Sequence, residues 1–465
     1  MRHAQNATLR APGTAVQGLT WALATAALLT LAATPAYSDE TRLSPFVPKI
    51  VGQEDFAYVW TAGIDGVGDG KDKLVTVAVN PATPALGKVI HILSMDGRRE
   101  AQHTQLSDDR RYLWASAQRG AKLYVFDVYS DPARPVLHRI IENFGSVSNT
   151  LGGPLKMLSL PGRMLINSLA KSPDAPAQTA LVEYTNAGEY VATHYSAPSA
   201  SAASSGAETG KLPSGFGFDA AALLQRKLLV TTSLGSINPE GPSADAAAFR
   251  APGASHRTFA DSVVLWDMPS RTSQATLEIA GAPIAIRCAK ADTNNYCFAV
   301  TAATARIWLI FENSERAWQA KPVATVGDGS GHVLAADLSI SADDQLLWVS
   351  DWNAGTSYTF DVSDPHAPQP LLVTRIGDQL AQVAQSWNGQ RLYFTSGVHS
   401  DWDKKTGARG DVQFFKAYAW DGAALSTMFA IDFAKEGLGR PLQIQLGAYA
   451  LFPAMPPNAE VNIHQ

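Results

Sequence analysis

The chain repeats short strand–turn–strand units, and this repetition limits its possible folds more than any other feature. One repeat places a proline-containing turn between two strand-like runs, at residues 77–84, 127–135 and 361–368. Proline cannot donate a hydrogen bond to a neighbouring strand, and the Asp or Asn before it can accept bonds within the turn. An apolar run follows each turn. The pattern therefore predicts successive β-strands rather than helices.

A second repeat places a tight polar turn before an aromatic strand, at residues 107–116, 341–350 and 386–396. Asn388 follows Asp343 by 45 residues, a spacing typical of one four-stranded propeller blade. A ring of blades protects the strand edges that a long β chain would otherwise expose. We therefore predict an all-β fold, a single β-propeller of about seven blades, in a domain over residues 39–465. Two polar segments, 196–213 and 236–261, are interpreted as surface insertions.

Charge and cysteine content exclude several classes of function. The formal net charge is −5, from 37 basic and 42 acidic residues, which argues against a nucleic-acid-binding protein. Two cysteines are too few for a disulfide-rich scaffold or for a four-cysteine zinc or iron–sulfur site. The sequence also contains no Walker loop, H-E-x-x-H, G-x-S-x-G or C-x-x-C motif. Any chemistry must therefore come from residues that the fold brings together.

Residues 1–38 have the pattern of an export signal. Arg2 and Arg10 precede an apolar run at 19–33, and the small residues Ala36 and Ser38 end the segment. The run is shorter than the roughly 20 residues that a membrane-spanning helix needs, and an uncleaved anchor is the alternative. We therefore expect a signal peptide, a periplasmic or secreted mature protein, and no membrane insertion after cleavage.

The two cysteines flank a turn-like segment between two strand-like runs. Facing positions of such a hairpin can form a disulfide, and an exported protein meets an oxidising compartment. A register shifted by one residue would instead leave Cys288 and Cys297 as two buried free thiols. The sequence leaves both interpretations open, and neither makes these cysteines catalytic.

Isolated residues are the candidates for chemistry. His103 precedes a blade turn, where its side chain could point into the central channel as a metal ligand, and a structural histidine is the alternative. Asp401 and Asp403 flank Trp402 in the densest polar and aromatic cluster of the chain. Paired carboxylates there could perform acid–base catalysis. The same cluster could equally be a capped loop that closes a blade.

Several short segments match the residues, order and spacing of a known protein family. They lie at residues 76–81, 124–128, 392–396, 400–404 and 432–439. They resemble the selenium-binding protein family, which includes copper-dependent methanethiol oxidases. The resemblance implies a seven-bladed propeller with copper held by histidines near the channel. It also implies an oxidoreductase that converts methanethiol to formaldehyde, hydrogen sulfide and hydrogen peroxide.

The resemblance transfers few of the family's copper ligands to this chain. Gln102, Pro154 and Ile444 stand at positions where the family has histidines, and only His103 survives. Met157 stands at a further ligand position, and its soft sulfur could replace an imidazole for cuprous copper.

Two functions are therefore compatible with the sequence. The first is an exported, methanethiol-oxidase-like enzyme with a rearranged copper site, whose partner is a small-molecule thiol. The second is a non-catalytic periplasmic propeller that binds a small molecule or an unknown partner protein. For the second, the polar and aromatic candidates are Arg287, Asp401, Trp402 and Asp403.

Overall fold

The computed structural model describes residues 52–142, 144–147, 151–170, 180–196, 217–233, 261–329, 332–400, 403 and 411–449. The expected signal peptide, and almost all of both polar insertions, lie outside the described residues. Among the residues described, no helix is long and apolar enough to cross a membrane.

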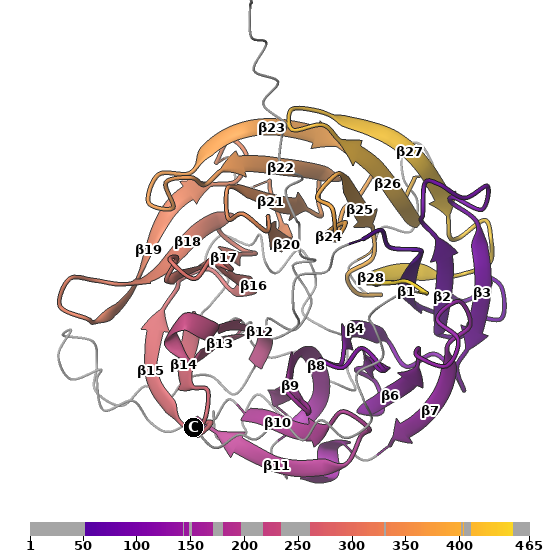
Figure 1. The fold of residues 1–465 in the computed structure, drawn as a ribbon, viewed down its shortest axis with the longest axis horizontal. Helices are drawn as coiled ribbons and strands as arrows, with labels where there is room; N and C mark the ends of the chain where they lie inside the picture. The colour runs from indigo at the N-terminus through magenta and orange to yellow at the C-terminus, as the bar shows by residue number, and fades with distance from the viewer. Residues whose placement is uncertain are drawn as a thin grey trace, which may run out of the picture. The chain divides into compact units, whose positions relative to one another are not determined.

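The strands form seven four-stranded antiparallel sheets arranged as blades around one centre (Figure 1). Blade 1 contains β1 (Phe56–Ala62), β2 (Lys73–Ala78), β3 (Val89–Ser94) and β28 (Arg440–Gly447). Blade 2 contains β4 (Ala101–Leu106), β5 (Tyr112–Ala117), β6 (Lys122–Asp127) and β7 (Val136–Ile141). Blade 3 contains β8 (Leu151–Leu160), β9 (Arg163–Ala170), β10 (Ala180–Thr185) and β11 (Tyr190–Tyr195).

The other four blades follow in chain order. Blades 4 and 5 contain β12 (Gly217–Leu223), β13 (Leu228–Ser233), β14 (Ser262–Asp267), β15 (Ser273–Glu278), β16 (Pro283–Cys288), β17 (Tyr296–Thr301), β18 (Arg306–Glu312) and β19 (Trp318–Thr325). Blades 6 and 7 contain β20 (Ala335–Ile340), β21 (Leu346–Asp351), β22 (Thr356–Asp361), β23 (Gln369–Arg375), β24 (Gln382–Gln385), β25 (Arg391–Thr395), β26 (Phe414–Trp420) and β27 (Leu425–Asp432). Within the ranges described, short 3-10 helices lie at Phe144–Val147 and Leu224–Arg226. The expected all-β propeller is confirmed, with seven blades.

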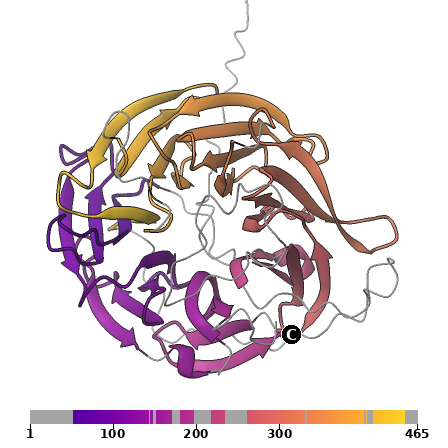
Figure 2. The ribbon, with the colours of Figure 1, turned by 180° about the vertical axis from the view of Figure 1, so that it is seen from behind.

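Strands far apart in the sequence close the ring. β28, near the C-terminal end, pairs with β1 and becomes the innermost strand of blade 1. The innermost strands of the other blades are β4, β8, β12, β16, β20 and β24. Both views of the ribbon show these seven strands around the centre and the last strand of each blade at the rim (Figures 1 and 2).

The two sequence repeats occupy equivalent places in different blades. Each proline turn connects the third strand of a blade to its outermost strand, as β6 to β7 and β22 to β23 show. Each polar turn connects the innermost strand to the second strand. In these turns the hydroxyl oxygens of Ser107, Ser341 and Ser386 accept hydrogen bonds from backbone N–H groups at 2.9–3.0 Å. One turn chemistry therefore recurs because one local geometry recurs.

Aromatic side chains bind neighbouring blades together. Trp114 on β5 lies 5.8 Å from Tyr184 on β10, and Trp348 on β21 lies 6.2 Å from Trp420 on β26, measured between ring centroids. In both cases the second strand of one blade contacts the third strand of the next. Such pairs contribute about 0.5–1.5 kcal/mol beyond the area that they bury. This packing makes the ring a rigid frame for the residues at its centre.

The structure pairs Cys288 with Cys297 as a disulfide between β16 and β17. Both cysteines are buried. Replacing both by serine, or reducing the bond, is expected to lower the free energy of unfolding by about 2–3 kcal/mol, because the crosslink restricts the unfolded chain. Urea denaturation with and without reductant measures this difference. Identical unfolding midpoints in the two conditions would contradict the prediction.

Candidate functional site

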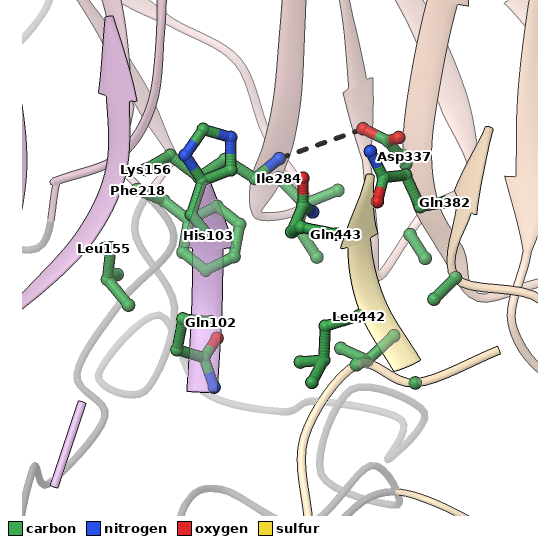
Figure 3. A pocket seen from close by; sticks show the side chains of 14 residues that line it. Gln102, His103, Leu155, Lys156, Phe218, Ile284, Asp337, Gln382, Leu442 and Gln443 are labelled. Carbon is green, nitrogen blue, oxygen red and sulfur yellow. Dashed lines mark ion pairs between the residues drawn. The ribbon is translucent and has the colours of Figure 1, made fainter. Parts of the chain in front are cut away.

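A small cavity lies in the central channel, and all seven innermost strands contribute to its wall. The lining residues are Gln102, His103, Leu155, Lys156, Phe218, Ile284, Ala336, Asp337, Ala381, Gln382, Gly397, Val398, Leu442 and Gln443. The cavity volume is about 50 Å³. A buried water needs about 10–15 Å³ on the same measure, so the cavity has room for a molecule of only a few heavy atoms. Figure 3 shows His103 and Lys156 on one side and Asp337 and Gln382 on the other.

Four buried charges from four consecutive blades meet beside this cavity. Lys156 on β8 donates to Asp219 on β12 at 3.0 Å, and its Nζ lies 3.8 Å from an Asp337 oxygen on β20. Arg287 on β16 lies between the two acids, with contacts of 2.8 Å to Asp219 and 3.2 Å to Asp337. Two cations therefore balance two carboxylates, which is the condition for keeping such charges in an interior.

The pKa values of this network follow from its pairing. Burial alone would raise the pKa of Asp219, but the positive charges of Lys156 and Arg287 hold it well below its usual range. Burial alone would lower the pKa of Arg287, but the two carboxylates raise it. Asp219 and Arg287 therefore stay charged at neutral pH.

His103 lies in the channel wall, as the sequence predicts, and one ring nitrogen is already engaged. The backbone N–H of Met157 donates to Nδ1 of His103 at 3.1 Å. In the neutral ring the proton therefore resides on Nε2. Coordination of a metal through Nε2 would move that proton to Nδ1, where it would face the N–H group of Met157. The hydrogen bond from Met157 therefore disfavours metal coordination by His103.

Met157 is buried among apolar side chains of blades 2 and 3, including Tyr112, Trp114 and Met164. It is not among the residues that line the cavity. The structure therefore places the backbone of Met157, rather than its sulfur, beside His103.

The residues described do not fit a copper ion. Cupric copper prefers several imidazole or oxygen ligands, and the cavity offers one imidazole, whose Nδ1 accepts a backbone hydrogen bond. The Asp337 carboxylate on the same wall is already paired with Arg287 and Lys156. Within the described ranges there is also no group of three or more His, Cys, Asp or Glu side chains suited to a metal.

Asp403 is a buried acceptor in the segment that follows β25. One of its carboxylate oxygens accepts hydrogen bonds from Trp352 Nε1 and from the backbone N–H of Val398, each at 3.2 Å. The other oxygen forms an ion pair with Arg440. Burial raises the pKa of Asp403. These contacts are those of a loop that closes a blade. Asp401 and Trp402 lie outside the described residues.

The sequence profile of the 56kDa selenium binding protein family (SBP56) matches residues 38–446. The chain belongs to the selenium-binding protein family. A methanethiol oxidase of Ruegeria pomeroyi is 39% identical over 417 residues, which cover 90% of this chain and 95% of the relative. A methanethiol oxidase of a Hyphomicrobium species is 38% identical over 405 residues, which cover 87% and 89% of the two chains.

Solved structures agree with this family at the level of the fold. A hypothetical selenium-binding protein from Sulfolobus tokodaii has a TM-score of 0.69 at 18% identity, and the match covers 90% of this chain and 99% of that one. A periplasmic gluconolactonase from Pseudomonas aeruginosa has a TM-score of 0.58 at 11% identity, covering 85% and 99%. At these identities the likeness concerns the propeller alone, which hosts unrelated functions.

The sequence analysis identifies His103 and Arg287 but misses Lys156, Asp219, Asp337 and Gln382. These four residues belong to four different innermost strands. A usable signal is present: Lys156, Asp219 and Asp337 are each the only charged residue of their innermost strand. If the blades are aligned on their polar turns, these polar residues of the innermost strands are seen to face the same channel.

Proposed function

We propose that this chain is a methanethiol-oxidase-like enzyme, an oxidoreductase that acts on methanethiol or a similarly small thiol in the central cavity. The observation that carries the proposal is the 38–39% identity, over nearly the whole chain, to two relatives named methanethiol oxidase. The cavity of about 50 Å³ supports it, because a one-carbon thiol fits that space.

A second candidate is a channel that binds such a small molecule, or a partner protein, without converting it. The poor fit of the donor set to copper favours this candidate. Only His103 supplies an imidazole to the cavity, and the Asp337 carboxylate there is paired with Arg287 and Lys156. Where the ligand is the small molecule, the two candidates differ only in turnover.

We also propose that the mature protein is exported to the periplasm or secreted. The pattern of residues 1–38 and the pairing of Cys288 with Cys297 support this location, because disulfides persist in oxidising compartments. Mass determination of the protein from a periplasmic extract tests it. A mass that includes residues 1–38 would contradict cleavage.

The test of the enzyme is methanethiol consumption with hydrogen peroxide formation by the mature protein, purified without chelating tags and analysed for copper. We expect turnover in the native protein and its loss in His103→Asn. Asparagine keeps an acceptor for the Met157 N–H and removes the imidazole, so the variant should stay folded. Absence of turnover, even after reconstitution with copper, would exclude the enzyme and leave the binding candidate.

A further inference from the structure

The ionised groups beside the cavity already balance one another. Lys156 donates to Asp219 at 3.0 Å and lies 3.8 Å from an oxygen of Asp337, and Arg287 contacts both carboxylates at 2.8 and 3.2 Å. The ammonium of Lys156 and the carboxylate of Asp337 both belong to the cavity wall, where Figure 3 marks the ion pair between them. A bound ion of either sign would therefore disturb a buried network whose charges already sum to zero.

The hydrogen-bonding capacity left unused in the cavity belongs to uncharged amide donors. Gln382 is 1% exposed, and its Oε1 accepts the backbone N–H of Ile444 at 3.0 Å. That bond fixes the orientation of the amide, so the NH₂ group is its other end. Within the ranges described, the buried Nε2 atoms of Gln382 and Gln102 have no hydrogen-bond partner. A buried donor without an acceptor is unfavourable, and a ligand with an acceptor atom would satisfy it.

Much of the remaining wall is apolar. Its larger apolar side chains are Leu155, Phe218, Ile284, Val398 and Leu442. These side chains can bury the carbon atoms of a ligand, whereas an amide group can bind its acceptor atom. The volume of about 50 Å³ limits that ligand to a few heavy atoms.

We propose that the cavity is a receptor for a small uncharged molecule with one hydrogen-bond acceptor, bound by the amide of Gln382, with its carbon atoms against the apolar wall. The neutrality of the ligand follows from the balanced charges, its acceptor from the unpartnered amide, and its size from the volume. The inference rests on the proposed function only where it concerns the substrate: methanethiol then enters in its uncharged S–H form rather than as the thiolate.

The test is a titration of the mature protein with probes of equal heavy-atom number, followed by ligand-observed NMR because such small ligands bind weakly. Dimethyl sulfoxide is neutral and carries one acceptor oxygen, methanesulfinate is an anion, and trimethylammonium is a cation. We expect dimethyl sulfoxide to bind one site per chain. We expect both ions to bind at least about tenfold more weakly, because each adds an unbalanced charge to the buried site.

Gln382→Met removes the amide donor without changing the charge of the site or the length of the side chain by much. We expect dimethyl sulfoxide to bind about three- to tenfold more weakly, which corresponds to the loss of one hydrogen bond. Gln319→Met, exposed on the outermost strand β19, is the matched control and should leave binding unaltered. If loss of the contact with Ile444 keeps Gln382→Met from folding, Ala336→Val, which adds bulk to the cavity wall, should also weaken binding.

Equal or tighter binding of either ion, or no saturable binding of dimethyl sulfoxide, would overturn the receptor for a neutral ligand. Unchanged binding in the folded channel variants would place the bound molecule elsewhere and overturn it as well. The proposed function fails separately. Dimethyl sulfoxide binding without methanethiol turnover would contradict the enzyme and support the receptor. Turnover without dimethyl sulfoxide binding would do the reverse.

Discussion

A chain that ends at residue 439 is expected not to fold, because it lacks β28. This strand pairs with β1 from Phe56↔Gly447 to Ala62↔Arg440 and is the only innermost strand supplied by the C-terminal end of the described propeller. Leu442, Ile444 and Leu446 are almost fully buried. Their burial alone contributes roughly 5–9 kcal/mol, which is comparable to the total stability of about 5–15 kcal/mol typical of a folded protein.

The loss should spread beyond blade 1, because β28 also contacts blade 7. The hydroxyl of Thr395 donates to the Leu442 carbonyl at 2.5 Å, and the Gly397 N–H donates to the Pro441 carbonyl at 2.9 Å. Circular dichroism, soluble yield and thermal unfolding measure the effect. A chain that ends at residue 449 keeps these contacts and is the control, expected to unfold cooperatively. Cooperative unfolding of the shorter chain would show that the ring does not depend on its closing strand.

The architecture could be predicted from the sequence because its local chemistry repeats. Asp109, Asp343 and Asn388 each accept a hydrogen bond from the backbone N–H two residues later, at 3.1–3.2 Å. Because the turn needs the same residues in each blade, it produces a repeat that can be recognised in the sequence. The pairing of β28 with β1 produces no such repeat, because it joins the two ends of the described propeller through backbone bonds that any non-proline residue can make.

The centre of the channel was only partly predictable, for a physical reason. Each blade contributes only one to four residues to the cavity, so residues from different blades that meet there are far apart in the sequence. Lys156 and Asp337 lie 3.8 Å apart in space and 181 positions apart in the chain. His103 was recognisable because histidine is a common metal ligand and this one stands beside a repeated turn. A lysine or glutamine within a strand has no comparable sequence feature that would indicate a position in the channel.

Replacing Arg287 by methionine is expected to lower the free energy of unfolding by about 3–5 kcal/mol at pH 7, because it leaves two buried carboxylates with the single cation Lys156. Asp337 loses its 3.2 Å partner, and Asp219 keeps only Lys156 as a cationic partner. Urea denaturation followed by tryptophan fluorescence measures the change. Arg316→Met is the matched control: Arg316 is exposed, pairs with Glu312 at 3.6 Å, and should contribute at most about 1 kcal/mol.

A second substitution separates lost charge balance from lost packing. In the Arg287→Met background, Asp219 and Asp337 share Lys156 as their cation. Asp337→Asn then removes the excess negative charge and should recover at least about 1 kcal/mol. In the native background the same change removes a partner of Arg287 and should destabilise. If packing alone mattered, Asp337→Asn would destabilise both backgrounds equally.

The pH dependence of Arg287→Met should also differ from that of the native protein. The depressed pKa of Asp219 in the native fold contributes stability that is present above about pH 4 and is lost as the pH falls below that value. In Arg287→Met, Asp219 loses one of the two cations that lower its pKa, so less of this stability remains. The deficit of the variant should therefore be full above about pH 4 and shrink as the pH falls below that value. A deficit that stays constant as the pH falls below about 4 would show that the guanidinium acts through its bulk and hydrogen bonds rather than through its charge.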